Sequence, residues 1–314
     1  MSPSKQDEEE QSEVPLVVDV TETSGSDTRT ALNWKNYGNI IFFILNIVFT
    51  YGVGTAGMFG TPDNGELSEK YQTIITPKSS AFIIWAVIFT FQAIFTVLQL
   101  LPSFRARPMV QEGVSFWYMI ACTAQIGWTI SFAYEVIPLS LVFMLLIWIS
   151  LMGILISQYY VKFDPTTASC SMKGLVEFWL LRFPFSIHGG WITAATALNI
   201  GVITVDNESS AATQLSVGIV CLAALHALSV WHLFGYKRPN YTIPIVLIWA
   251  NGWIYGELQN PKPLIIATFD ESVIKGVAYA AFTVSMIITI QVVLRAGFVM
   301  FNYFRGKSYL QANE

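Results

Sequence analysis

Three hydrophobic segments of this chain combine aromatic rings with amide or imidazole groups at helical spacing. In the segment Leu181–Asn199, one stripe of a 3.6-residue helix carries Pro184, His188, Trp191 and Asn199. Polar side chains in hydrocarbon almost always face the interior of a helix bundle or a water-filled cavity. Such a face is suited to recognising a flat apolar molecule, because rings supply contact area and amides orient polar substituents.

Two other segments repeat the pattern. Their stripes are Phe82, Trp85, Phe89 and Gln92 in the first, and Gln125, Trp128, Phe132 and Glu135 in the second. Ordinary bundle packing also places rings at this spacing, with amides as hydrogen-bond partners between helices. An apolar pocket with a few convergent polar groups is the usual form of a small-molecule site. The stripes therefore predict either the lining of a ligand pocket or a solid packed core.

Catalytic and metal-binding motifs are missing from the sequence. It contains no HExxH, GxSxG or Walker motif. His226 and His232 are six residues apart and point to different faces of a helix, while His188 lies in another segment. We therefore expect neither an enzyme nor a metal site nor a nucleic-acid partner.

The composition places the three stripes in a membrane protein. Of the 314 residues, 54% are hydrophobic and 12% are charged, whereas soluble domains carry about 25% charged residues. Apolar runs close to the ~20 residues that cross ~30 Å of hydrocarbon recur along the chain. The predicted spans are 38–59, 80–101, 115–134, 137–160, 175–204, 212–235, 241–257 and 273–302. We expect an all-α, polytopic helix bundle of about eight transmembrane helices, with the lipid bilayer as its partner.

The basic residues predict how these spans are oriented. Of the 17 Lys and Arg residues, 13 fall on the side of the N-terminus when eight spans are assumed. The other four are Lys70, Lys78, Lys262 and Lys275. Because basic residues concentrate in cytoplasmic loops, the partition predicts that both termini are cytosolic. The acidic, Ser/Thr-rich stretch 1–36 is predicted to be a disordered cytosolic tail.

Residues of the second and third segments resemble motifs of the TspO/MBR family (tryptophan-rich sensory protein, translocator protein). In its second helix, a proline precedes a tryptophan by eight residues and an aromatic residue by twelve, as Pro77, Trp85 and Phe89 do here. Gln125-x-x-Trp128 is similar to the Asn-x-x-Trp of its third helix. Gln125 and Phe89 stand where the family has Asn and Tyr.

The fifth segment extends the resemblance. Pro184-Phe185, Trp191 and Asn199 resemble the family's Pro-Tyr, Trp and Asn, and the eight-residue spacing from Trp191 to Asn199 is kept. Three additional residues separate Pro184 from Trp191. The chain is more similar to longer members of the family, which carry extra helices. The resemblance implies a core of five helices at 37–205, three further transmembrane helices at 206–303 and a short cytosolic tail at 304–314.

The resemblance also implies a pocket among the five helices that binds tetrapyrroles, sterols or similar apolar molecules, with no other cofactor. The loop Thr61–Pro77 would close its outer mouth. The aromatic walls would come from Trp85, Phe89, Trp128, Trp191 and, beside them, Pro184 and Phe185. The polar substituents of the ligand would be oriented by Gln125, His188 and Asn199.

Four hypotheses follow for the function. The leading one is a membrane protein that binds or translocates a planar apolar molecule of the tetrapyrrole or sterol type. A proton-coupled secondary transporter is the second, since His188, Glu177 and Glu135 are ionisable groups in or near spans. An enzyme acting on a bound tetrapyrrole is the third and depends on the resemblance alone. A ligand-free scaffold is the fourth, and a homodimer is an open alternative to a single copy.

Overall fold

The computed structural model describes residues 31–161 and 172–311, and within these ranges every regular element is a helix. This confirms the all-α fold class. The long helices of the described chain are α2 (Trp34–Gly52), α4 (Ile84–Leu98), α6 (Trp117–Ala133), α7 (Ile137–Tyr160), α9 (Phe183–Asp206), α10 (Ala211–Phe234), α11 (Thr242–Leu258) and α13 (Glu271–Gln311). Each overlaps one of the eight predicted spans.

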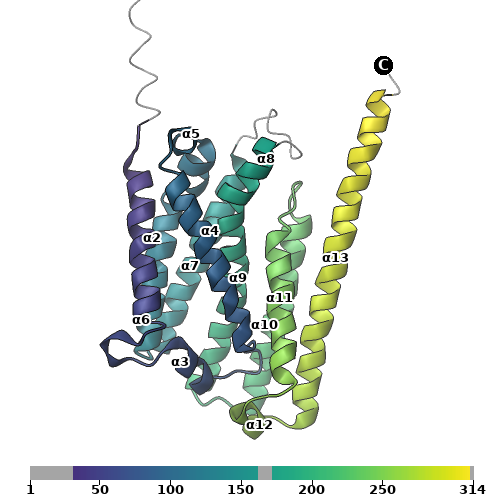
Figure 1. The fold of residues 1–314 in the computed structure, drawn as a ribbon. Helices are drawn as coiled ribbons and strands as arrows, with labels where there is room; N and C mark the ends of the chain where they lie inside the picture. Colours follow the sequence, from purple (N-terminus) through teal and green to yellow (C-terminus); the bar gives the residue numbers. More distant parts are fainter. Residues whose placement is uncertain (1–30, 162–171, 312–314) are drawn as a thin grey trace, which may run out of the picture.

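Short helices fill the connections between the long ones. They are η1 (Met58–Gly60), α3 (Asn64–Lys70), η2 (Ser79–Ile83), α5 (Pro102–Arg105), η3 (Met109–Val114), α8 (Met172–Glu177), η5 (Phe178–Arg182) and α12 (Pro263–Thr268). The first residues of α2 and the last of α13 lie at one end of the bundle, and α3 and α12 lie at the other (Figure 1). We refer to the first as the terminal end and to the second as the cap end.

Helix α9 lies at the centre of the bundle. It packs against α4 and α7 on one side and against α10 and α11 on the other, while α13 packs on α10 and α11. Two glycines permit these contacts. A Cβ on Gly189 would lie 3.2 Å from side-chain atoms of Leu155 on α7, and one on Gly190 would lie 2.9 Å from Cβ of Val246 on α11. The α9 helix therefore joins the five-helix core to the three helices that follow.

Four helices are long and apolar enough to cross a membrane: Ser79–Leu98, Ile137–Tyr160, Ala211–Phe234 and Glu271–Arg305. The others are shorter or more polar. Helices α6 and α11 have 17 residues each, and α2 buries Asn36, Asn39 and Asn46. The chain is therefore an integral membrane protein, whereas the count of eight spans stays a prediction.

Several boundaries differ from the predicted ones. Helix α2 begins at Trp34, inside the predicted tail, because Asn33 caps its first turn by accepting hydrogen bonds from the backbone. It ends at Gly52 and not at 59, and the left-handed φ of 59° at Gly57 and of 66° at Phe59 does not allow an α-helix to continue through these residues. Helix α13 continues to Gln311, past the predicted end at 302. The rest of the predicted N-terminal tail, 1–30, lies outside the described residues.

Candidate functional site

A cavity of about 520 Å³ lies within the five-helix core, toward the cap end. Its walls come from α2, α4, α6, α7 and α9. The segment Thr61–Pro77, which contains α3, covers it, and we call this segment the cap. The volume is within the range of ~300–1,000 Å³ that is usual for small-molecule sites. A solid plug of side chains between α4, α6 and α9, which a ligand-free scaffold would favour, is not what the described residues form.

Six of the nine predicted ligand residues line this cavity. They come in pairs from three helices: Trp85 and Phe89 from α4, Gln125 and Trp128 from α6, and Trp191 and Asn199 from α9. Each pair lies on one of the predicted stripes. The spacing of three to eight residues within each pair turns both side chains to the same helix face. Ligand contact by these six residues stays a prediction.

The other three predicted residues lie outside the lining. Phe185 is fully buried and packs edge-on against Phe95, with the ring centroids 4.8 Å apart. Pro184 is in the first turn of α9, near the terminal end. His188 is buried outside the lining, where its Nδ1 lies 2.8 Å from Nε2 of Gln92 and its ring forms an edge-type contact with Trp85, with the ring centroids 5.5 Å apart. It therefore contacts Trp85 and Gln92 of α4 and does not line the cavity.

The aromatic rings of the lining form two groups. Trp85 and Phe89 stack with centroids 5.2 Å apart and an interplanar angle of 20°, and Trp191 stands edge-on to Trp85 at 6.5 Å. Trp128 and Phe132 stack at 5.2 Å with an angle of 13°. Stacked and edge-on pairs at these separations are favourable beyond their area of contact. The rings therefore present fixed flat surfaces to the cavity.

Some polar atoms of the lining residues form hydrogen bonds within the protein, and others have no hydrogen-bond partner among the described residues. Nε1 of Trp128 donates a hydrogen bond of 3.3 Å to Oδ1 of Asn199, whose amide nitrogen donates to the Ser140 hydroxyl. Nε1 of Trp191 and Oε1 of Gln125 are buried and have no hydrogen-bond partner among the described residues. Leaving such groups unpaired costs about 1–3 kcal/mol each. A ligand that accepts from Trp191 and donates to Gln125 would recover part of that cost.

Much of the lining was not singled out in the sequence. Phe82, Phe132 and Ala195 fall on the predicted stripes but were not among the predicted ligand residues. The remaining aliphatic and cap residues carry no local signal, since an isolated Leu, Ile or Val in a hydrophobic segment is unremarkable. They include Leu67, Met144, Ile147, Ile192 and Val202. Lys262, which precedes α12, also lines the cavity although it is distant in sequence from the five-helix core.

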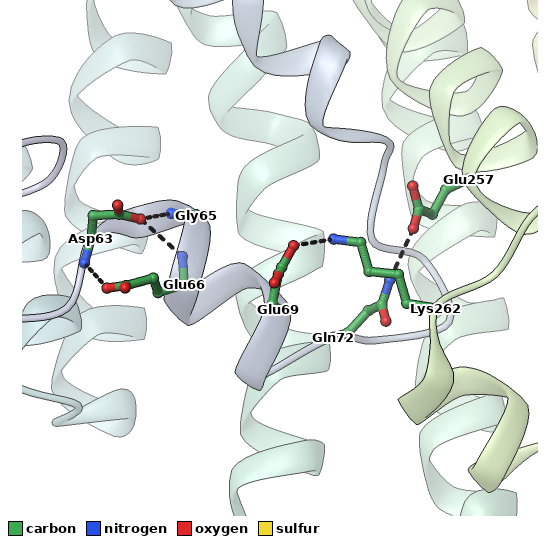
Figure 2. A network of polar contacts seen from close by, with 7 residues as sticks. All are labelled: Asp63, Gly65, Glu66, Glu69, Gln72, Glu257 and Lys262. Atoms are coloured by element: carbon green, nitrogen blue, oxygen red, sulfur yellow. Dashed lines mark hydrogen bonds and ion pairs between the residues drawn. The ribbon is translucent and has the colours of Figure 1, made fainter.

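The cap is fastened to the core at its C-terminal end. Leu67 is buried against the core, and Tyr71 donates a 2.5 Å hydrogen bond to the Glu135 carboxylate in the turn between α6 and α7. Lys70 pairs with the same carboxylate. At the other end of α3, Asp63 and Glu66 form a capping box with the backbone (Figure 2). Residues of the predicted loop Thr61–Pro77 therefore line the cavity, and closure of a ligand pocket by this loop stays a prediction.

The Glu135 cluster predicts how the cap responds to pH. Hydrogen bonds from Lys70, and then from Tyr71, lower the pKa of Glu135 below its ordinary value of 4.5, and the same contact raises the pKa of Lys70 above 10.5. The Glu135 carboxylate stabilises the folded state fully above its ordinary pKa, and this stabilisation is lost as the pH falls through the lowered pKa. The Lys70 ammonium stabilises the folded state fully below its ordinary pKa of 10.5, and this stabilisation is lost as the pH rises through the raised pKa.

We therefore expect Glu135→Gln to lower the thermal unfolding midpoint by an amount that is constant from about pH 5.5 to pH 9.5. The difference should shrink as the pH falls below 4.5, where the unfolded carboxyl takes up a proton, and should vanish below the lowered pKa, where the carboxyl is protonated in both states of the unmodified protein. Thermal melts of both proteins across this range measure it. A difference that stays constant down to pH 3 would contradict the assigned role of Glu135.

Comparison with known proteins gives one finding. A protein-family model described as TSPO-like protein matches residues 36–294. No curated protein and no solved structure matches the chain. The matched range begins in α2 and ends in α13, so the likeness includes the three helices beyond the five-helix core.

Proposed function

Because this chain belongs to the TSPO-like protein family, we propose that it binds or translocates an apolar planar small molecule, of the tetrapyrrole or sterol type, in the five-helix cavity. One observation carries the proposal: six predicted ligand residues from three helices line the same cavity. The cavity is lined largely by rings and aliphatic side chains, and three buried polar atoms of its lining residues have no partner among the described residues: Nε1 of Trp191, Oε1 of Gln125 and Oδ1 of Asn64. This combination suits a ligand with an apolar body and a hydroxyl or similar substituent.

The proposed orientation has the terminal end in the cytosol. Basic residues concentrate at that end, among them Lys35, Arg105, Arg182, Lys237 and Arg295. Four lie at the cap end, namely Lys70, Lys78, Lys262 and Lys275. By the preference of basic residues for cytoplasmic loops, the cavity would then open toward the outer half of the membrane.

A proton-coupled transporter is less well supported. Its three candidate proton carriers lie apart and are engaged: Glu135 is paired with Lys70, Glu177 is paired with Arg182 at 3.3 Å, and His188 contacts Gln92. They form no chain of ionisable groups along the bundle. Binding or translocation of an apolar molecule by way of the cavity therefore remains the proposal.

Saturable binding of a fluorescent sterol or of protoporphyrin to the detergent-purified protein tests the proposed function. We expect one ligand per chain and energy transfer from tryptophan to the ligand, because Trp85, Trp128 and Trp191 line the cavity. Binding that increases linearly with ligand concentration, without saturation, would show partitioning into the micelle and would contradict the proposal.

Gln125→Leu tests the orienting role of the unpaired amide oxygen. We expect it to weaken binding of a sterol about 2- to 10-fold, the effect of one lost hydrogen bond, and to leave its 3-methyl ether unaffected because an ether cannot donate. Equilibrium titration measures the dissociation constants of the sterol and of its 3-methyl ether, and their ratio is compared between proteins. Gln214→Leu on α10, outside the lining, is the matched control. The same ratio of dissociation constants in the unmodified protein, in Gln125→Leu and in Gln214→Leu would rule out this role for Gln125.

A further inference from the structure

The cavity reaches the side of the helix bundle in the space between α2 and α4. Tyr51 near the end of α2 and Ile83 just before α4 both line the cavity, yet 48% and 66% of their surfaces are exposed. Ala86, one turn further along α4, lines the cavity and is exposed as well. Thr55 and Ser79 beside them, and Gly65 and Glu69 on α3, line the cavity and are exposed too, so the cavity reaches the surface between α2 and α4 and also at α3.

The opening between α2 and α4 faces the bilayer. Ile83 and Ala86 belong to Ser79–Leu98, one of the helices long and apolar enough to cross a membrane. Val87 and Ile94, on the same helix, are also exposed and apolar, as lipid-facing residues are. In a membrane, the exposed surface around the opening is therefore in contact with hydrocarbon.

On the side of the cavity that faces α12, polar contacts join α3 and the residue Gln72 after it to α11 and to the segment before α12. Glu69 of α3 and Lys262 before α12 are the charged residues of the described lining, and their side chains pair at 3.3 Å (Figure 2). Beside them, Nε2 of Gln72 donates a 3.1 Å hydrogen bond to the buried carboxylate of Glu257 on α11. Pulling α3 away from α11 would leave a buried carboxylate and a buried amide without this bond, which is unfavourable.

We propose that the ligand exchanges directly with the bilayer, passing laterally between α2 and α4, and that Tyr51 and Ala86 set the rate of that passage. The inference depends on the proposed function and adds the source of the ligand, a lipid-phase molecule. Tyr51 is the side chain positioned to act as the gate, because its ring lies 5.9 Å from that of Phe89, inside the opening. Ala86 is the narrowest side chain on the opposite edge.

Two substitutions with opposite expected effects test the passage. The full chain is placed in lipid nanodiscs and mixed rapidly with vesicles that carry a neutral fluorescent sterol, and energy transfer from tryptophan reports binding. Tyr51→Ala should raise both the association and the dissociation rate about five-fold, and Ala86→Phe should lower both about five-fold, since a gate changes the barrier for both directions. A change in only one of the two rates would contradict the role of Tyr51 and Ala86 as a gate.

Two further variants distinguish the routes. Val87→Phe adds the same ring one residue away, on exposed surface outside the lining, and should leave the rates unchanged. Gln72→Met removes the hydrogen bond to Glu257 on the side that faces α12, outside the lining, and should also leave them unchanged. If Gln72→Met raises both rates while Tyr51→Ala and Ala86→Phe leave them unchanged, the ligand passes beside α12 and the lateral route is wrong.

A second measurement keeps the inference testable when no sterol binds, an outcome that would contradict the proposed function. Ala195→Cys places a thiol in the cavity wall, and mass spectrometry follows its reaction with an apolar maleimide and with a sulfonated one. The apolar reagent should react faster, and Tyr51→Ala should accelerate it further. Faster reaction with the sulfonated reagent would overturn the lateral opening.

Discussion

The double substitution Trp128→Ala/Trp191→Ala is expected to weaken binding of a sterol or protoporphyrin at least 100-fold. Both rings line the cavity from different helices, α6 and α9, so they contact different parts of a bound molecule. Burying an aromatic or large aliphatic side chain is worth about 1.5–3 kcal/mol, and a loss of about 3 kcal/mol or more corresponds to a factor of at least 100 in affinity. Equilibrium titration of the detergent-purified protein measures the effect.

A matched pair of tryptophans provides the control. Trp179 in η5 and Trp231 in α10 are partly exposed and lie outside the lining, so Trp179→Ala/Trp231→Ala removes as much aromatic surface without touching the cavity. We expect this control to bind with unchanged affinity. Equal affinities in the two double variants, with helical content retained in both, would contradict the assignment of the cavity as the binding site.

The second large effect is expected in stability, at Gly190. A Cβ at this position would lie 2.9 Å from Cβ of Val246 and 3.2 Å from the backbone Cα of Ile243. Neither atom is the flexible end of a side chain, so α11 must move away from α9 to admit Gly190→Leu. Overpacking of this kind costs about 1–3 kcal/mol and sometimes more. We expect the unfolding midpoint in detergent to fall by about 5–10 °C.

Gly252→Leu is the control for this effect. Gly252 lies on α11 itself, and no atom lies within 4 Å of the Cβ it would gain. We expect its midpoint to be equal to or slightly above that of the unmodified protein, because leucine favours a helix more than glycine does. A midpoint for Gly190→Leu as high as that for Gly252→Leu would show that α9 and α11 do not pack as closely as described.

The three helix faces of the site could be predicted from the sequence because they follow helical periodicity. Trp85 and Phe89 are four residues apart, Gln92 follows Phe89 by three, and His188 precedes Trp191 by three, and such spacing fixes which side chains share a face. Periodicity does not say at which level of the bundle a cavity lies. His188 therefore shares a stripe with Trp191 but lies outside the lining.

The cap and its fastening depend on contacts between distant segments. The pair of Glu69 and Lys262 joins positions 193 residues apart, and Gln72 and Glu257 are 185 apart. No pattern in a single sequence indicates such pairs. The sequence could indicate that Thr61–Pro77 covers the cavity only through the family resemblance, and it gave no sign that Lys262 reaches the same cavity.

The central claim is that an apolar molecule binds in the cavity walled by α4, α6 and α9. A photoreactive sterol, cross-linked to the full chain in nanodiscs and mapped by mass spectrometry, tests it most directly. The account predicts labelling at Trp85, Trp128 and Trp191 or their cavity neighbours, and loss of that labelling in the presence of excess unlabelled sterol. Labelling confined to the lipid-facing surface of α13, at residues such as Val293 and Phe298, and unaffected by the competitor would contradict it.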